Sequence, residues 1–312
     1  MVRNVQVASE NTELSDELHA EQLAADAAVK QVNLSVTSAA SPFAYQVLAM
    51  IASGEVFGCD VEINLKLCDA DASALSAVAM EVVDLASGSV RRPPSVTSDP
   101  TQFFAGADVI LLLDDVTALE CEPRADWLQR VYNHFADYAR HIDAAAARSD
   151  IYVIIPAIAQ KSTANFIATV ISRCAPNTPP ENIIVPSRLV ENRAKAAISR
   201  RAGVNAGSIV DLVVWGDPSA ATPDRFAVDI TSAKVFDCDH SAVWGPQHCR
   251  SVETVVGDDR WLQQALPAAI ASSSSSSSFV ATAGALTSFL SDWWTGNSSR
   301  KRFHSVAVMS QG

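Results

Sequence analysis

Two Trp-Gly runs are candidate sites for acid–base chemistry in this chain. Such chemistry would need a histidine near the run, since a histidine placed after a hydrophobic strand can act as a general base. One run is residues 215–219 (WGDPS), which follow the mostly apolar residues 209–214 (IVDLVV). Its fourth position is Pro218, which has no titratable group and no backbone N–H, so it cannot accept a proton. The other run lies at 244–245 and precedes His248, for which we expect no orienting Asp. We therefore predict that His248 is not catalytic, and that the remaining histidines are exposed or internally satisfied.

Metal-binding chemistry has equally little support. Residues 237–240 (DCDH) lie upstream of His248 and Cys249, but this spacing matches no standard zinc pattern. The six cysteines are scattered and form no Cys-x-x-Cys pair, which favours reduced structural thiols. We predict no metal site.

The elements that would position any site alternate between apolar strands and amphipathic helices. This alternation predicts a doubly wound parallel sheet, a Rossmann-like α/β domain over 31–156, followed by an α+β domain over 157–312. Expected strands include 32–37, 63–68, 107–113, 151–155 and 209–215, with a hairpin formed by 225–230 and the region of Val235. Expected helices begin at Ser41-Pro42 and cover 71–85, 124–148, 161–173, 191–202, 258–270 and 279–295. The serine tract 272–278 reads as a flexible insert, with phosphorylation as the alternative.

Composition limits the partners. The chain has 312 residues and a net charge of −12, which argues against nucleic acid and anionic membranes as main partners. No apolar run approaches the ~20 residues of a transmembrane helix. Residues 1–30 form an acidic extension that lacks the features of a secretory signal or a mitochondrial transit peptide. We therefore expect a cytoplasmic protein.

Several motifs resemble one enzyme family. These are 36–41 (VTSAAS), 54–58 (GEVFG), 188–195 (RLVENRAK), 213–216 (VVWG), 241–246 (SAVWGP) and 305–312 (SVAVMSQG). Their order is similar to that of cytosolic-type malate dehydrogenases, in the lactate/malate dehydrogenase superfamily, and most similar to the divergent malate dehydrogenase 1B-like branch. The resemblance implies NAD as cofactor, interconversion of malate and oxaloacetate, and a homodimer. The family normally continues beyond this C-terminus, so we expect an incomplete second domain.

The cofactor positions implied by the resemblance are altered. The glycines of the family's dinucleotide loop correspond to Ser38 and Ser41, and a Cβ at Ser41 stands where the pyrophosphate must approach. Pro42 removes one N–H from the helix N-terminus, although Ser41-Pro42 remains a good helix start. Asp69 matches the acid that binds the adenine ribose, and an ordinary strand-end Asp is the alternative. NAD binding is therefore expected to be weak or lost.

Two further carboxylates oppose a dinucleotide. Asp114 and Asp115 stand at the end of an apolar strand, where the family has Gly-Ser. Both are expected near the dinucleotide crevice. A carboxylate about 4 Å from a phosphate charge costs roughly 4 kcal/mol at an effective dielectric near 20.

The substrate positions are altered as well. The catalytic histidine of the family corresponds to Pro218, and the Asp that orients it corresponds to Val190. Of the two arginines on the family's mobile loop, one corresponds to Leu119 and the other to Arg124. The third arginine is retained as Arg193. The family Asn corresponds to Ala157. With all of these replacements, the resemblance leaves no intact catalytic residue.

Three functions remain open. The first is a malate dehydrogenase-like protein without catalysis that acts as an interaction or structural subunit. The second is an active NAD-dependent malate dehydrogenase with rearranged groups. The third is a non-catalytic binder of a nucleotide or dicarboxylate, which would use Asp69, Arg124 or Arg193, since two arginines can grip one carboxylate.

Overall fold

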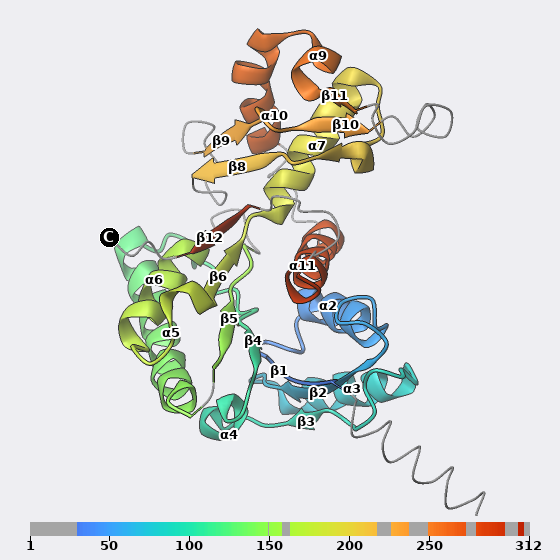
Figure 1. Ribbon diagram of the computed structural model, residues 1–312. Helices are drawn as coiled ribbons and strands as arrows, with labels where there is room; N and C mark the ends of the chain where they lie inside the picture. Colours follow the sequence, from blue (N-terminus) through green and yellow to red (C-terminus); the bar gives the residue numbers. More distant parts are fainter. Residues whose placement is uncertain are drawn as a thin grey trace, which may run out of the picture.

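A seven-stranded sheet forms the centre of the protein in the computed structural model, which describes residues 30–148, 150–157, 163–216, 226–236, 249–272, 279–296 and 305–308. The strand order is β12-β6-β5-β4-β1-β2-β3, and every neighbouring pair is parallel except β12 with β6. This confirms the predicted doubly wound α/β architecture (Figure 1). The strands are β1 (Lys30–Val36), β2 (Val61–Leu67), β3 (Ser95–Val96), β4 (Val109–Leu111), β5 (Tyr152–Ile154), β6 (Ile183–Pro186) and β12 (Val306–Val308).

Helices cover both faces of the sheet because successive strand residues point to opposite sides. In β4, Val109 and Leu111 pack with α2 and α3, whereas Ile110 and the following Leu112 pack with α5 and α6. Strands that are buried on both faces have continuous apolar sequences, as a parallel sheet requires. The helices of this part are α2 (Pro42–Ala52), α3 (Ala72–Asp84), α4 (Pro100–Phe104), α5 (Arg124–Ala146) and α6 (Ala164–Cys174).

Local capping explains where three of these helices begin. The Ser41 hydroxyl accepts a hydrogen bond from the N–H of Ala44 at 3.2 Å, and Pro42 follows it at the first helical position. The predicted helix start at Ser41-Pro42 is thus confirmed. Asp71 and Asp99 cap α3 and α4 in the same way.

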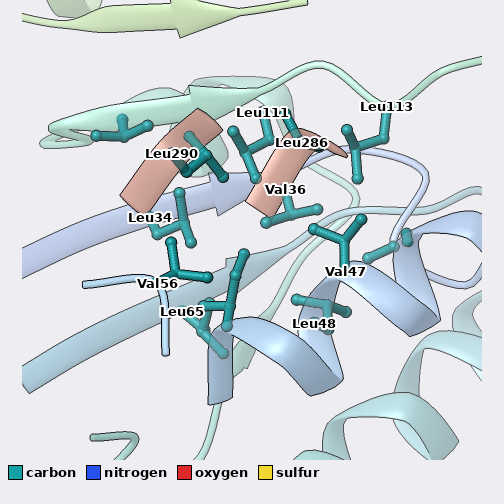
Figure 2. Close-up of a cluster of buried hydrophobic side chains, with 14 of the residues drawn as sticks. Leu34, Val36, Val47, Leu48, Val56, Leu65, Leu111, Leu113, Leu286 and Leu290 are labelled. Carbon is teal, nitrogen blue, oxygen red and sulfur yellow. The ribbon is translucent and has the colours of Figure 1, made fainter. Parts of the chain in front are cut away.

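One helix from late in the chain completes the face that carries α2. Helix α11 (Phe279–Trp294), which the sequence predicted at 279–295, packs against α2 beside the sheet (Figure 1). Its Leu286 and Leu290 meet Val47 of α2 and the strand residue Leu34 in one buried cluster (Figure 2). The apolar stripe of α2 is therefore used inside the chain.

The second part of the chain contains two small antiparallel sheets. The expected strand 209–215 is divided at Asp211, whose φ of 56° interrupts it. The expected hairpin between 225–230 and Val235 is wrong, because β9 pairs with β8 while β10 pairs with β7 and β11. The elements here are α7 (Arg188–Ala202), β7 (Ile209–Val210), β8 (Val213–Gly216), β9 (Phe226–Asp229), β10 (Lys234–Phe236), β11 (Cys249–Ser251), α9 (Val252–Val256), a π-helical turn (Trp261–Ala265) and α10 (Leu266–Ser272).

The two parts are interleaved along the chain. Strands β6 and β12 and helix α11 come from the stretch 157–312, yet they complete the sheet and its α2 face. Helix α11 also contacts α7, so it bridges the sheet and the second part.

A buried ionic cluster lies where α7 meets α11. Arg188 pairs through Nη1 with Glu191 Oε1 at 3.4 Å and through Nη2 with the carboxylate of Asp292 on α11. Lys195 Nζ lies 2.7 Å from the same Glu191 oxygen. Glu191 is 1% exposed and Arg188 7% exposed, and the cluster leaves Arg188 Nε and Glu191 Oε2 without a hydrogen-bond partner. These charges are therefore desolvated and depend on one another.

Candidate functional site

The loop between β1 and α2 is where the resemblance implies a dinucleotide. Ser38 adopts φ 47°, a left-handed conformation that a glycine reaches at lower cost. The turn that the family builds with glycine is thus formed here with a serine. Ser41 takes an extended conformation (φ −70°, ψ 149°) and uses its hydroxyl as the α2 cap.

Backbone N–H groups of this loop are bonded inside the chain. In a phosphate-binding loop such donors point at the ligand. Here the helix start has one donor fewer, because Pro42 carries no N–H. The internal bonds run from the N–H of Ala39 to the Cys68 carbonyl at 3.1 Å, from Ala40 to Asp69 Oδ2 at 3.0 Å, from Ser41 to the Ser38 carbonyl at 3.0 Å and from Ala44 to Ser41 Oγ at 3.2 Å.

Asp69 lies beside this loop, directly after β2. Its Oδ2 accepts the N–H of Ala40, and its Oδ1 accepts the N–H of Asp71 at 3.1 Å. The carboxylate therefore joins the β1–α2 loop to the start of α3. Its expected contact with a ribose stays a prediction.

Asp114 is the centre of a polar network at the carboxyl ends of β1 and β4. It accepts hydrogen bonds from the hydroxyls of Thr37 and Ser38, the second at 3.1 Å, and from Tyr138 OH at 3.2 Å. His134 Nε2 lies 3.1 Å from the same carboxylate. Only 9% of the Asp114 side chain is exposed, and four side chains from the β1–α2 loop and α5 surround it. The carboxylate is thus fully engaged within the protein.

Burial and this charge alter the neighbouring titratable groups. Desolvation raises the pKa of the Tyr138 hydroxyl, and the negative charge of Asp114 adds to that effect. The pKa of the Cys68 thiol is raised to about 11, first by burial and then by Asp114 and Asp69. Both groups therefore stay neutral near pH 7, where they act as hydrogen-bonding or packing groups.

Asp115 differs from its neighbour. It lies at the surface, and the partial desolvation there raises the pKa of its carboxyl group. From the sequence, Asp114 and Asp115 were both expected to be charges near the dinucleotide crevice. In the structure, the Asp114 carboxylate is bonded to side chains of the β1–α2 loop and of α5, whereas Asp115 is exposed. Their expected repulsion of a dinucleotide stays a prediction.

His134 is the residue whose role the sequence underestimated. The sequence predicted an exposed or satisfied histidine, which is confirmed, but it did not predict that His134 shares the Asp114 carboxylate with Tyr138. The spacing of His134 and Tyr138, four residues apart on one helix, places both on the same face. The four-residue spacing could have indicated that His134 and Tyr138 act together. The sequence could not show which strand ends beside this face of the helix.

The substrate positions are placed on separate elements. Leu119 is 63% exposed in the segment between β4 and α5, and Arg124 is an exposed residue in the first turn of α5. Arg193 lies on α7, half-buried, and desolvation lowers the pKa of its guanidinium group. Val190 is buried in the apolar core of the second part, so it supplies packing where the family has an acid.

Other expected features fall outside the described residues. Pro218, His248, the run 237–240 and the extension 1–29 are among them. Within the described ranges, no three His, Cys, Asp or Glu side chains are grouped to hold a metal. No helix in those ranges has the length and apolarity needed to cross a membrane.

Sequence comparisons point to one family. No family model matches the chain. It is 30% identical over 290 residues to the malate dehydrogenase of Rubrobacter xylanophilus, which covers 89% of this chain and 81% of that protein. It is 29% identical to proteins named "Putative malate dehydrogenase 1B" from Branchiostoma floridae and Homo sapiens, which cover 100% and 83% of this chain but 59% and 48% of those proteins. The chain thus spans about half the length of these two relatives.

Solved structures agree with the sequence comparisons. The malate dehydrogenase of Naegleria fowleri is 26% identical, with a TM-score of 0.72 over 90% of this chain and 82% of that one. The Trichomonas vaginalis lactate dehydrogenase in complex with NADH and oxamate has the same TM-score and coverage at 20% identity, which shows a shared fold. The chain therefore belongs to the malate dehydrogenase family, within the lactate/malate dehydrogenase superfamily.

Proposed function

We propose that this chain is a malate dehydrogenase-like protein that no longer interconverts malate and oxaloacetate. The observation that carries the proposal is the Asp114 network, which places an engaged carboxylate at the switch point of the sheet between β1 and β4. In doubly wound folds, dinucleotides bind in the crevice at this switch point. A dinucleotide would have to displace internal hydrogen bonds and tolerate a nearby negative charge.

The residues of the loop do not fit NAD well. A pyrophosphate needs close backbone approach and free N–H donors. Ser38 and Ser41 add side chains where the family has glycine, and Asp69 already holds the N–H of Ala40. We therefore propose that NAD binding is weak or lost, although NADH is bound in a Trichomonas vaginalis relative of this fold.

The substrate side supports the same conclusion. The position of the family's general base is Pro218 and that of its orienting acid is Val190. Loss of general acid–base help alone lowers a rate by roughly 10²–10⁴. Arg124 and Arg193 could still hold a dicarboxylate, so binding without turnover is the second candidate. Their guanidinium groups favour it, because arginine binds carboxylates in a bidentate manner.

Calorimetry with NAD, beside a malate/NAD assay on the same sample between pH 6 and 10, tests this proposal. We expect no malate oxidation above background and no NAD binding at low micromolar concentrations. An active malate dehydrogenase serves as the positive control. A turnover number of about 10 s⁻¹ or more, which is typical of enzymes, would overturn the proposal.

Loop variants separate the steric explanation from the electrostatic one. We expect the double variant Ser38→Gly, Ser41→Gly to remain without tight NAD binding. It removes the bond from the Ser38 hydroxyl to Asp114, but the Asp114 carboxylate keeps its contacts with Thr37, His134 and Tyr138, and Asp69 keeps the N–H of Ala40. Low micromolar binding by this variant alone would show that the added side chains were the whole obstacle. If calorimetry shows that malate or oxaloacetate binds to the wild-type protein without turnover, the function of a non-catalytic dicarboxylate binder is favoured.

We further propose a cytoplasmic protein that acts through its surface as a homodimer. Apolar side chains lie exposed on α3 and just after it, at Met80, Val83 and Leu85, and on α2 at Tyr45. Exposed apolar groups of this kind favour association. The small residues of α7 do not supply this surface, because Ala194 and other α7 residues are buried against the second part. Sedimentation at several concentrations should give a discrete dimer, and a monomer at tens of micromolar would contradict it.

A further inference from the structure

One face of helix α5 binds the segment that precedes it. Residues 127, 130, 134 and 138 are three to four positions apart, so they line one side of the helix. Each of them forms a side-chain hydrogen bond to a group between 114 and 122. The described segment therefore runs along α5 and is attached at successive points.

Two of these bonds go to the backbone of the segment. Trp127 Nε1 donates to the Val116 carbonyl at 2.6 Å, and the Trp127 ring is itself buried. Arg130 Nη2 donates to the Thr117 carbonyl at 2.9 Å. Contacts to backbone atoms set the path of the segment and do not depend on which side chains it carries.

Glu122 forms the last attachment of the segment to α5. Its two carboxylate oxygens meet Arg130 Nε and Nη2, each at 2.7 Å, in a bidentate pair. The N–H of Leu119 also donates to Glu122 at 2.9 Å, and the Glu122 side chain is only 10% exposed. Cys121, between them, has a φ of 62°. The turn from 119 to 122 is thus held by one carboxylate that bonds both the helix and the segment.

We propose that residues 115–122 form a strap that Arg130 fastens to α5, and that Arg130 and Glu122 together hold one conformation of the segment that is a mobile loop in the family. Arg130 acts as a positioning residue. The strap keeps Leu119 turned to solvent and holds Asp115 at the surface beside the Asp114 network. This inference does not rest on the loss of NAD binding, because the bonds that Trp127 and Arg130 form with Val116, Thr117 and Glu122 do not involve the β1–α2 loop.

The strap should persist over a wide pH range. Hydrogen bonds from Arg130 and from the Leu119 N–H lower the pKa of Glu122 to about 2. A carboxyl group whose pKa is depressed in the folded protein contributes stability above its unfolded value of 4.5, and that contribution is lost as the pH falls through about 2. The ion pair between Arg130 and Glu122 is therefore expected to be fully formed at pH 5 and above.

Hydrogen–deuterium exchange of the full chain tests the strap. In Glu122→Gln and in Arg130→Gln, amide exchange in 117–122 should be at least about tenfold faster than in the wild type, consistent with loss of local protection. Arg140→Gln is the matched control, since it breaks an exposed pair with Asp137 on the same helix and should leave this segment unchanged. Peptides from β1 and β4 should stay protected in every variant, which excludes general unfolding.

A charge-exchange variant gives the decisive result. Glu122→Arg combined with Arg130→Glu should restore part of the protection that each single change removes, because the ion pair is rebuilt in reverse. The inference is overturned if 117–122 already exchanges as fast in the wild type as in Arg130→Gln. It is equally overturned if Arg130→Gln accelerates exchange in β1 and β4 as much as in the strap. NAD calorimetry on the same variants is a separate readout, so failure of the strap and failure of the proposed function can be told apart.

Discussion

Replacing Arg188 with leucine is expected to lower the free energy of unfolding by about 3–5 kcal/mol at pH 7, because breaking a buried ion pair leaves an uncompensated charge. Arg188 joins Glu191 on α7 to Asp292 on α11. Without it, Lys195 is the one cationic partner of the nearly inaccessible Glu191 carboxylate among the residues that the structure describes. The change also releases α11 from α7, so both parts of the chain should lose stability together. Urea denaturation followed by circular dichroism measures the effect.

Two controls distinguish charge from packing. Arg140→Gln breaks an exposed ion pair and should change stability by less than about 1 kcal/mol. The double variant Arg188→Leu, Glu191→Leu should be more stable than Arg188→Leu alone, since it removes the stranded carboxylate. If the double variant is the less stable of the two, the effect comes from lost packing.

Replacing Asp114 with alanine is expected to destabilise the protein by about 2–4 kcal/mol. Hydrogen bonds to a charged group contribute roughly 1.5–3 kcal/mol each, but the half-exposed donors can turn to water. The strongest loss is expected at the partly buried Tyr138, whose hydroxyl loses Asp114 as its acceptor, while Ser38 and His134 can be solvated. The fully buried Thr37 hydroxyl keeps the Leu111 carbonyl as an acceptor at 3.3 Å. Because Ser38 is held in a left-handed conformation, the β1–α2 loop should also become more mobile. Thermal denaturation at pH 7 measures the stability change.

The adjacent carboxyl group provides the matched control. Desolvation raises the pKa of Asp115, so its ionised form opposes folding above the unfolded pKa, and this penalty is present at pH 7. Asp115→Asn removes that charge and should leave stability unchanged or slightly higher. Equal losses in Asp114→Ala and Asp115→Asn would mean that the network around Asp114 contributes nothing specific.

Local sequence was sufficient for most of the elements. The alternation of apolar strands and amphipathic helices predicted the parallel sheet, and α5, α6, α7 and α11 lie close to the predicted ranges. Ser41-Pro42 marked a helix start because capping depends on a few neighbouring residues. The replacements at Pro218 and Val190 are likewise read directly from the chain, whatever the packing.

Pairing between distant segments could not be read in the same way. The sequence indicated strands near 225–230 and Val235, but their real partners are β8, β7 and β11. Two adjacent strand-like runs suggest a hairpin, whereas the observed pairing depends on which strands offer a free edge in the folded second part. Asp211, with its positive φ, separates β7 from β8 and lets them enter different sheets.

By itself, the sequence determined which chemical groups are present, and the resemblance implies that Ser38, Val190 and Pro218 stand where the family uses glycine, aspartate and histidine. Only the tertiary structure decided what the remaining polar groups do. Asp114 appeared as a charge facing a ligand, and in the structure it is an acceptor shared by the β1–α2 loop and α5. No sequence feature singled out Arg130 and Glu122, which form a bidentate pair between α5 and the segment before it. The physical reason is that a charge acquires its role from the donors and solvent around it, and folding brings those together from positions far apart in the chain.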